Sequence, residues 1–229
     1  MKYLLFTLFL LTFLQTKAQF ALVESNDGFV NLRESSESGS KIIQKLNNGS
    51  IVMVDEIEYS PEQNWLYVKI DEEKSGYIHK SGLKFIHSLT KGNVNLRTEN
   101  SIQISLNEYE LNISTKKFER KNYQITYKDN KKPNSEQVLK INGKDFWGTD
   151  FSLPNLAYNK MWFKSKGKTI NLNTDGLFNP NLKTTNIFIN KATNSIYIIA
   201  QNSDGAGSYS ALWLIENGKF TRRIGILTA

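Results

Sequence analysis

The sequence predicts a mainly all-β protein built from two parts. Apolar and polar residues alternate in short runs along most of the chain, a pattern typical of strands with one buried face. Aromatic residues make up 12% of the chain and only 4 prolines occur, which favours strands and argues against disorder. The charge balance changes sign between residues 19–86 and residues 87–229, as expected for two domains.

Residues 1–18 have the features of a secretory signal peptide and are set aside from the fold. Lys2 precedes an apolar run from Leu4 to Leu14, and Thr16 and Ala18 supply the small residues of a cleavage site before Gln19. The run is shorter than the roughly 20 residues that span a bilayer, although an uncleaved anchor remains the alternative. We therefore expect export to the periplasm or beyond, with no membrane span after cleavage. The chain has 0 cysteines, so we expect no lipoprotein anchor and no disulfide.

The two parts differ in charge. Residues 19–86 contain seven Lys and Arg against eleven Asp and Glu, a net charge of −4, whereas residues 87–229 contain twenty against eleven, a net charge of +9. In an exported protein, a basic part favours an acidic envelope surface or an acidic partner over nucleic acid. A lysine-rich solvated surface would have the same composition, so both interpretations stay open.

Residues 21–86 contain the clearest strand pattern. Val30 and Leu32 alternate with Asn31 and Arg33, and a turn-rich segment follows at residues 34–40. Further strands are expected at 42–46, 51–54, 65–70 and 76–79, separated by polar loops. The residues at 47–49, Asn-Asn-Gly, tolerate positive φ and predict a hairpin.

The order of motifs in this part resembles the bacterial SH3-type domain, called SH3b. Five elements occur in the family's order: VNLR at 30–33, LNNG at 46–49, GSIVMV at 49–54, WLYV at 65–68 and GYI at 76–78. The departures are mild, since isoleucine replaces a valine with a register shift of one and Tyr77 stands where tryptophan is commoner. The resemblance implies a small, strongly curved β-barrel that binds cell-wall glycopeptide or docks other domains.

Five residues of this barrel are candidate ligand contacts. If Leu66 and Ile78 face the core, then Trp65, Tyr67, Tyr77 and His79 lie outside, where aromatic rings can stack on a sugar ring or a peptide plane. Arg33 is the fifth candidate, although its guanidinium can instead pair with Glu34 or Glu37. Trp65 can alternatively cap the barrel end or cover a contact between domains. The acidic loops can meet amines of a wall peptide or the basic second part of the same chain.

The hexapeptide GNVNLR at 92–97 echoes GFVNLR at 28–33, but the rest of the module is not repeated. At an offset of 64, the partners of Leu46, Gly49, Trp65 and Gly76 are Glu110, Ile113, Asp129 and Lys140. A true repeat would keep its apolar residues and glycines along the whole unit. We therefore expect a barrel at 19–86, a linker at 87–91 and a different β-rich domain of unrecognised family at 92–229.

The second part also predicts strands and tight turns. Residues 102–106 and 109–113 alternate, and residues 123–127 are rich in strand formers. Residues 105–117 fit a short helix as the alternative, and residues 154–162 are where we expect helical structure. Strands at 196–200, 209–215 and 220–224 predict a meander whose last turn, Asn217-Gly218, suits type I′. An antiparallel sheet or sandwich is the expected architecture.

The sequence offers few groups for catalysis. Without cysteine there is no thiol nucleophile, and the 2 histidines cannot assemble an HExxH zinc helix or a three-histidine site, so we expect no cofactor and no metal. No GxSxG motif is present. Carboxylate-only glycoside hydrolysis remains as a third hypothesis, with candidate acids Asp145, Asp150, Asp175 and Asp204. Residues 171–176 only superficially fit the start of a calcium loop, and a turn is preferred.

The leading hypothesis is an exported, non-enzymatic binding protein whose first module recognises cell-wall glycopeptide or docks an envelope protein. The alternative is an inhibitor or immunity-like partner acting through the basic second part. In that case the loop at 202–208 is the candidate contact, with Asp204, Gly205 and Gly207 as a possible ligand-binding loop.

Overall fold

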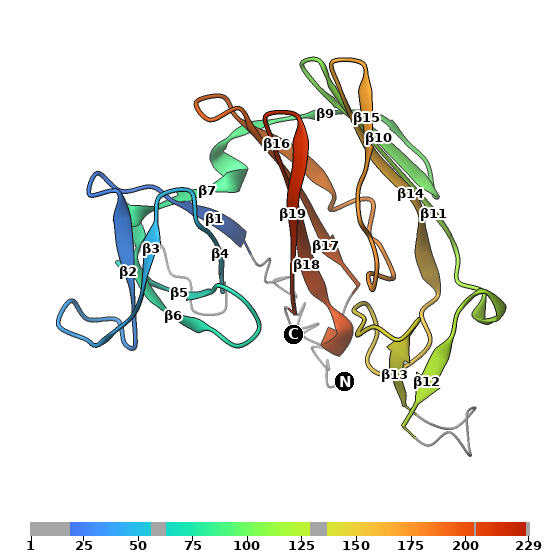
Figure 1. The fold of residues 1–229 in the computed structure, drawn as a ribbon, viewed down its shortest axis with the longest axis horizontal. Helices are drawn as coiled ribbons and strands as arrows, with labels where there is room; N and C mark the ends of the chain where they lie inside the picture. Colours follow the sequence, from blue (N-terminus) through green and yellow to red (C-terminus); the bar gives the residue numbers. More distant parts are fainter. Residues whose placement is uncertain (1–18, 56–62, 129–136, 204, 228–229) are drawn as a thin grey trace, which may run out of the picture.

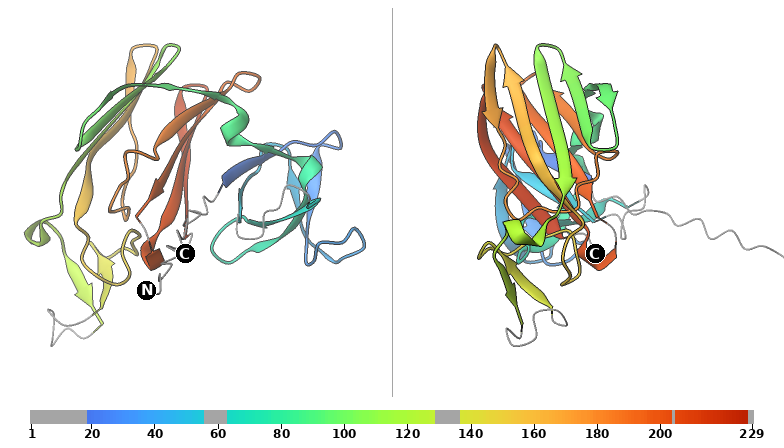
Figure 2. Two further views of the ribbon diagram at one scale, coloured as in Figure 1. Left: turned by 180° about the vertical axis from the view of Figure 1, so that it is seen from behind. Right: turned by 90° about the vertical axis from the view of Figure 1, so that its right-hand side faces the viewer.

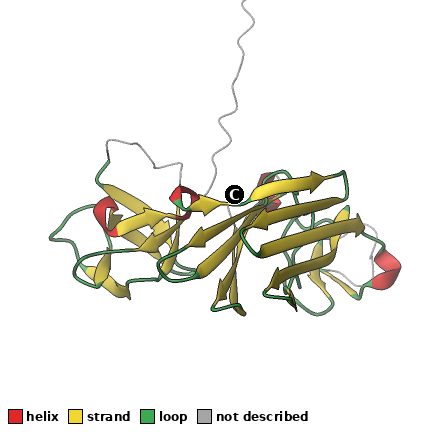
Figure 3. Ribbon diagram, turned by 90° about the horizontal axis from the view of Figure 1, so that it is seen from above, coloured by secondary structure: helices red, strands yellow, loops and turns green. Residues whose placement is uncertain are grey.

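The computed structural model describes residues 19–55, 63–128, 137–203 and 205–227, most of which form antiparallel strands (Figure 1). The predicted all-β class is confirmed. Residues 1–18, the expected signal peptide, lie outside the described residues. Three layers follow one another across the molecule: a curled N-terminal barrel, a middle sheet and an outer sheet (Figures 1 and 3).

The N-terminal barrel is one sheet with the strand order β3-β2-β6-β5-β4-β1-β7. Its strands are β1 (Gln19–Val23), β2 (Phe29–Arg33), β3 (Ile42–Asn47), β4 (Ile51–Val54), β5 (Trp65–Lys69), β6 (Ser75–His79) and β7 (Leu83–Phe85). Alternate apolar residues fill the inside of the curl, with Leu32, Val68 and Ile78 completely buried. Burial of a leucine-sized side chain stabilises by about 1.5–3 kcal/mol, so these alternating residues drive the closure of the sheet.

The turn at 47–49 is correctly placed, but the predicted hairpin is wrong. Strands β3 and β4 are not neighbours, because β3 pairs with β2 while β4 pairs with β1 and β5. Gly49 has a φ of +83°, and Asn48 uses its side chain to hold the backbone of Ser25 through two hydrogen bonds of 3.0 and 2.8 Å. The turn therefore carries the chain across the barrel, a long-range arrangement that local turn chemistry does not encode.

The rest of the chain forms a sandwich of two five-stranded sheets (Figure 2). The middle sheet has the order β19-β18-β17-β16-β8 and the outer sheet β15-β14-β11-β10-β9. The middle strands are β8 (Thr90–Lys91), β16 (Asn186–Asn190), β17 (Ser195–Asn202), β18 (Tyr209–Glu216) and β19 (Lys219–Leu227). The outer strands are β9 (Asn93–Arg97), β10 (Ser101–Leu106), β11 (Tyr109–Lys117), β14 (Leu156–Ser165) and β15 (Lys168–Asn171).

A short ribbon, β12 (Ile125–Tyr127) with β13 (Val138–Ile141), extends from one end of the sandwich. The segment expected as a linker contains a 3-10 turn at Ile86–Ser88 and the strand β8, which pairs with β16. The chain thus passes from the barrel directly into the middle sheet.

Two expectations for the second part are settled by the strands. Residues 109–117 form β11, so the preferred strand is confirmed over a helix. The expected helix at 154–162 is wrong, because residues 156–165 form β14 and pair with β11 along its length. Met161 and Phe163 face the core at a spacing of two, opposite Ile113 and Leu111. Cross-strand packing therefore overrides any local helical preference.

The last turn agrees with the predicted type I′ hairpin. Asn217 has a φ of 51° and Gly218 a φ of 73°, and both central residues of that turn type need positive φ. Strands β18 and β19 pair directly on either side of the turn. The meander expected from residues 196–224 is therefore confirmed.

The middle sheet is buried on both faces. Tyr209, Ala211 and Trp213 of β18 point toward the outer sheet and join the largest hydrophobic core. Leu212 and Leu214 point the other way and pack against the barrel. This explains why β18 reads as a continuous apolar run, since a strand covered on both sides shows no alternation.

The barrel docks on the middle sheet through an apolar interface. Four outward side chains of β1 and β4, namely Phe20, Leu22, Ile51 and Met53, meet Phe188, Tyr197, Leu212 and Leu214 of the sheet. At the rim, Trp147 Nε1 donates a hydrogen bond of 3.0 Å to Glu72 Oε1 in the loop between β5 and β6. An acidic loop of the barrel thus does contact the second part, through an indole rather than through a lysine.

Buried tyrosines close one end of the sandwich. The Tyr209 hydroxyl donates to the Phe178 carbonyl at 2.9 Å, and the Asn202 amide donates to the Tyr158 hydroxyl at 3.3 Å. Burial raises the pKa of Tyr158 and the pKa of Tyr209 above their usual value. These phenols therefore stay neutral and act as structural hydrogen-bonding groups.

Candidate binding site

The outer face of β5 and β6 presents the aromatic residues that the sequence places there. Leu66, Val68 and Ile78 are buried in the barrel, which confirms the expected alternation on both strands. Trp65, Tyr67 and Tyr77 are partly exposed on the opposite face, and His79 is exposed. A strand that buries alternate aliphatic residues must turn the residues between them outward.

The four aromatic residues form two cross-strand pairs. Trp65 lies opposite His79, with ring centroids 5.4 Å apart and planes at 87°, and Tyr67 lies opposite Tyr77, with centroids 5.2 Å apart and planes at 62°. Edge-to-face pairs at such distances stabilise by about 0.5–1.5 kcal/mol beyond their burial. Each pair therefore holds its rings in a fixed orientation.

Polar contacts orient two of these side chains further. The Tyr67 hydroxyl lies 2.6 Å from the Ser75 hydroxyl, and His79 Nδ1 lies 2.7 Å from the Ser81 hydroxyl. The indole N–H of Trp65 has no hydrogen-bond partner among the residues that the structure describes. It is therefore available to donate to a ligand that stacks on the ring.

Arg33 lies beside this pair of strands. It is opposite Tyr77 across β2 and β6, which places its side chain on the same outer face. Its guanidinium donates from one terminal nitrogen to the Ser40 carbonyl at 2.5 Å and closes the loop at 34–40. The contact is with a backbone carbonyl rather than with the carboxylates of Glu34 or Glu37. The loop bond uses one of five N–H donors, so the guanidinium keeps further donors for other contacts.

Sequence reasoning missed Ile42, which extends the same face. Ile42 lies opposite Arg33 across β2 and β3 and is 49% exposed. A row of side chains therefore crosses four strands in the order Ile42, Arg33, Tyr77 and Tyr67. The sequence shows Ile42 as an apolar residue of a predicted strand. It does not show that Ile42 lies opposite Arg33, because that pairing depends on the bulge between Leu32 and Arg33. We call Arg33, Trp65, Tyr67, Tyr77 and His79 the aromatic face.

The aromatic face and the docking interface occupy different strands of the curled sheet. Docking uses β1 and β4, whereas the aromatic face lies on β2, β5 and β6. In Figure 1, β2 and β3 lie on the side of the barrel away from the middle sheet. The barrel can therefore stay docked while the aromatic face is open to a ligand.

The loop at 202–208 packs against its own domain. Gly207 is buried, and its carbonyl accepts a hydrogen bond of 3.1 Å from the amide of Gly148. The Ser203 hydroxyl donates to the Gly148 carbonyl at 2.8 Å. Gly205 begins a short 3-10 turn, while Asp204 lies outside the described residues. The described part of this loop therefore serves to join two segments of the sandwich.

We expect Gly207→Ala to lower the free energy of unfolding by about 2 kcal/mol, because the added methyl group would overlap the backbone of Thr149 and overpacking costs about 1–3 kcal/mol. Urea unfolding followed by circular dichroism measures the change. Gly39→Ala is the matched control, since a methyl group there meets no atom within 4 Å. Equal stability of the two variants would contradict the close packing of this loop.

The candidate acids of the second part are on the surface. Asp175 pairs with Lys144 at 2.5 Å, and Asp145 lies 3.7 Å from Lys140. The segment at 173–176 is a turn, as preferred from the sequence: Asn173 accepts a hydrogen bond from the Asp175 amide through its side chain, and its carbonyl accepts one from Trp213 Nε1. Asp150 is exposed. Asp145 and Asp175 therefore have lysine partners.

Within the described ranges, no group of three or more His, Asp or Glu side chains is arranged to hold a metal ion. Among the same residues, no helix is long and apolar enough to cross a membrane.

Comparison with known proteins identifies the barrel. Residues 28–84 match the family model described as the bacterial SH3 domain. The matched range includes every residue of the aromatic face. No curated protein and no solved structure matches the chain. Domains of this family serve as binding modules, often for cell-wall components. The N-terminal barrel of this protein is thus a bacterial SH3 domain, joined to a β-sandwich.

Proposed function

We propose that the protein is exported and binds cell-wall glycopeptide through the aromatic face of its SH3 domain. One observation carries this proposal: Trp65 and His79, and Tyr67 and Tyr77, form two fixed edge-to-face pairs on an outer surface that the docking interface leaves open. Bacterial SH3 domains are common in exported proteins, which agrees with the signal-peptide features of residues 1–18.

The chemistry of the aromatic face suits a glycopeptide. The ring faces of Trp65 and Tyr77 offer flat apolar area for a sugar ring or a peptide plane, at a small entropic cost because the pairs are already oriented. Arg33 supplies cationic donors for a carboxylate of the stem peptide. The partly exposed rings of Trp65, Tyr67 and Tyr77 therefore support a role in ligand binding.

Co-sedimentation of residues 19–229 with purified peptidoglycan tests the proposal. We expect Trp65→Ala and Tyr77→Ala each to weaken binding about 30-fold, because aromatic anchors at binding sites contribute about 2 kcal/mol. Phe151→Ala is the control, since Phe151 is an exposed aromatic residue of the sandwich, 52% accessible. If wild type stays in the supernatant, or if all three variants bind like wild type, wall recognition by the aromatic face is wrong.

A further inference from the structure

The outer face of the outer sheet is mostly polar, with a single aromatic residue on it and an exposed leucine, Leu96, at its β9 edge. Inward residues of β10, β11 and β14 fill the core of the sandwich, so the residues between them face outward. These outward residues are Ser101, Gln103, Ser105, Glu110, Asn112, Ser114, Lys160, Trp162 and Lys164. This face is seen in the right-hand view of Figure 2, and it lies at the opposite end of the molecule from the SH3 domain.

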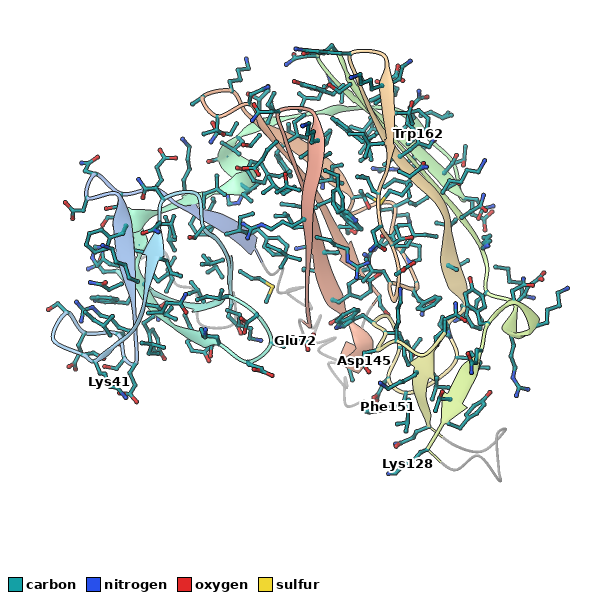
Figure 4. The ribbon with its side chains drawn as sticks, in the orientation of Figure 1. Lys41, Glu72, Lys128, Asp145, Phe151 and Trp162 are labelled. Carbon is teal, nitrogen blue, oxygen red and sulfur yellow. The ribbon has the colours of Figure 1, made fainter. Side chains whose placement is uncertain are left out.

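Trp162 belongs to a row of five residues that crosses the whole sheet, and it lies next to the last residue of the row, which is on the edge strand β15. The pairing runs from Leu96 to Gln103, Asn112, Trp162 and Asn171, one residue on each of β9, β10, β11, β14 and β15. Neighbouring strands lie about 4.8 Å apart, so the row is roughly 19 Å long. Figure 4 labels Trp162 on the outer sheet, away from the core. We call these five residues the amide row.

The polar groups of the amide row are unused. Among the described residues, no side-chain hydrogen-bond partner exists for the amides of Gln103, Asn112 and Asn171 or for the indole N–H of Trp162. The flanking side chains, by contrast, pair with one another: Ser105 donates to Asn95 at 2.9 Å, Asn159 donates to Ser114 at 3.3 Å, and Lys164 lies 3.8 Å from Glu110. The row thus offers donors and acceptors on both sides of the Trp162 ring that no described side chain occupies.

The charge beside Trp162 is positive. Lys160 and Lys164 lie on either side of Trp162 on the outward face of β14. Lys164 pairs with Glu110, whereas Lys160 makes no ion pair with the described residues. An acidic group placed near Trp162 would therefore meet one free ammonium group. The second part of the chain is also basic, with the net charge of +9 from residue 87 onward.

We propose that the amide row binds a glycan strand whose pyranose rings carry carboxylates. A pyranose ring has an apolar face that stacks on an indole and hydroxyls that hydrogen-bond to amides, while its carboxylate pairs with Lys160. A protein partner fits less well, because interface cores are enriched in aromatic residues and depleted in serine, whereas this face has one aromatic ring. A single nucleic-acid strand needs several stacking rings and cations along its path.

The 4 tryptophans of the chain provide the readout. In nitrogen-15-labelled residues 19–229, each indole N–H gives its own signal, and Trp162 is the one on the amide row. The probes are tetragalacturonate, cellotetraose as the neutral tetramer, and peptidoglycan glycan strands freed of their peptides. Tetragalacturonate and the peptidoglycan strands both carry carboxylates on their pyranose units. Comparing these two probes distinguishes a polysaccharide from outside the cell from the wall itself.

We expect an acidic probe to shift the Trp162 indole signal and cellotetraose to bind more weakly. Trp162→Ala should weaken binding of that probe about tenfold, a loss of about 1.4 kcal/mol. Lys160→Gln should remove the preference for the acidic probe, while Lys168→Gln, another exposed lysine, should not.

Two results overturn the proposal. A Trp162 signal that moves with none of the three probes excludes glycan binding at the amide row. Equal affinity for the acidic and neutral tetramers excludes the role of Lys160. This test is independent of the SH3 domain. In the same spectra the Trp65 indole signal reports on binding at the aromatic face, and the two results that concern the amide row do not depend on whether the Trp65 signal shifts.

Discussion

Replacement of Trp213 by alanine is expected to lower the free energy of unfolding by about 4 kcal/mol, because truncation of a buried tryptophan costs about 3–5 kcal/mol. Trp213 is completely buried between the two sheets of the sandwich. Its indole N–H donates to the Asn173 carbonyl at 2.8 Å, and its ring lies edge-on to Tyr158 with centroids 6.4 Å apart. The variant loses this packing and leaves the carbonyl with one donor fewer.

Urea unfolding monitored by far-ultraviolet circular dichroism measures the loss, since that signal does not depend on the removed indole. Trp213→Phe is the control: it keeps an aromatic ring and loses the hydrogen bond, so we expect it to be more stable than the alanine variant. A loss below about 1 kcal/mol for Trp213→Ala would contradict its place in the core, because such small effects are typical of surface positions.

Replacement of the neighbouring residue, Leu212, by aspartate is expected to release the SH3 domain from the sandwich. Leu212 is completely buried on the opposite face of β18, where it packs against the barrel. A carboxylate there has no partner and costs several kcal/mol to bury, whereas undocking returns it to water. We therefore expect the barrel to separate while the sandwich, whose core lies on the other face, stays folded.

The Trp147 indole signal and the radius of gyration measure this release. In the docked protein Trp147 donates to Glu72 of the barrel, so undocking should move its indole signal and increase the radius of gyration in small-angle scattering. Leu212→Ala is the milder control, expected to cost about 2–5 kcal/mol and to keep the domains together. A compact Leu212→Asp protein with an unchanged Trp147 signal would show that this interface does not hold the domains.

The local pattern of the sequence predicts the aromatic strands of the SH3 domain well because β5 and β6 alternate strictly. Leu66, Val68 and Ile78 mark the inner face, so the aromatic face follows from their positions alone. The hairpin expected at residues 47–49 fails because the strands on either side pair with distant partners. Turn residues specify a local backbone conformation, while the choice of neighbouring strand depends on long-range packing.

The second part was harder to predict because its faces are assigned by contacts far apart in the sequence. Residues 209–215 are recognisable as a strand, but the residues that cover Leu212 come from the N-terminal barrel, including Phe20 of β1. The amide row combines single residues from five strands, none of which forms a motif by itself. Only the register of the sheet brings Gln103, Asn112 and Asn171 into one row with Trp162.

Titration of nitrogen-15-labelled residues 19–229 with soluble disaccharide-peptide fragments of peptidoglycan measures whether the aromatic face of the SH3 domain binds wall glycopeptide. The aromatic face predicts that the Trp65 indole signal shifts with added fragment, while the signal of Trp213, buried in the sandwich, stays in place. In Tyr77→Ala the same shift should need about 30-fold more fragment. A Trp65 signal that stays unmoved up to millimolar fragment would show that the aromatic face does not bind wall glycopeptide.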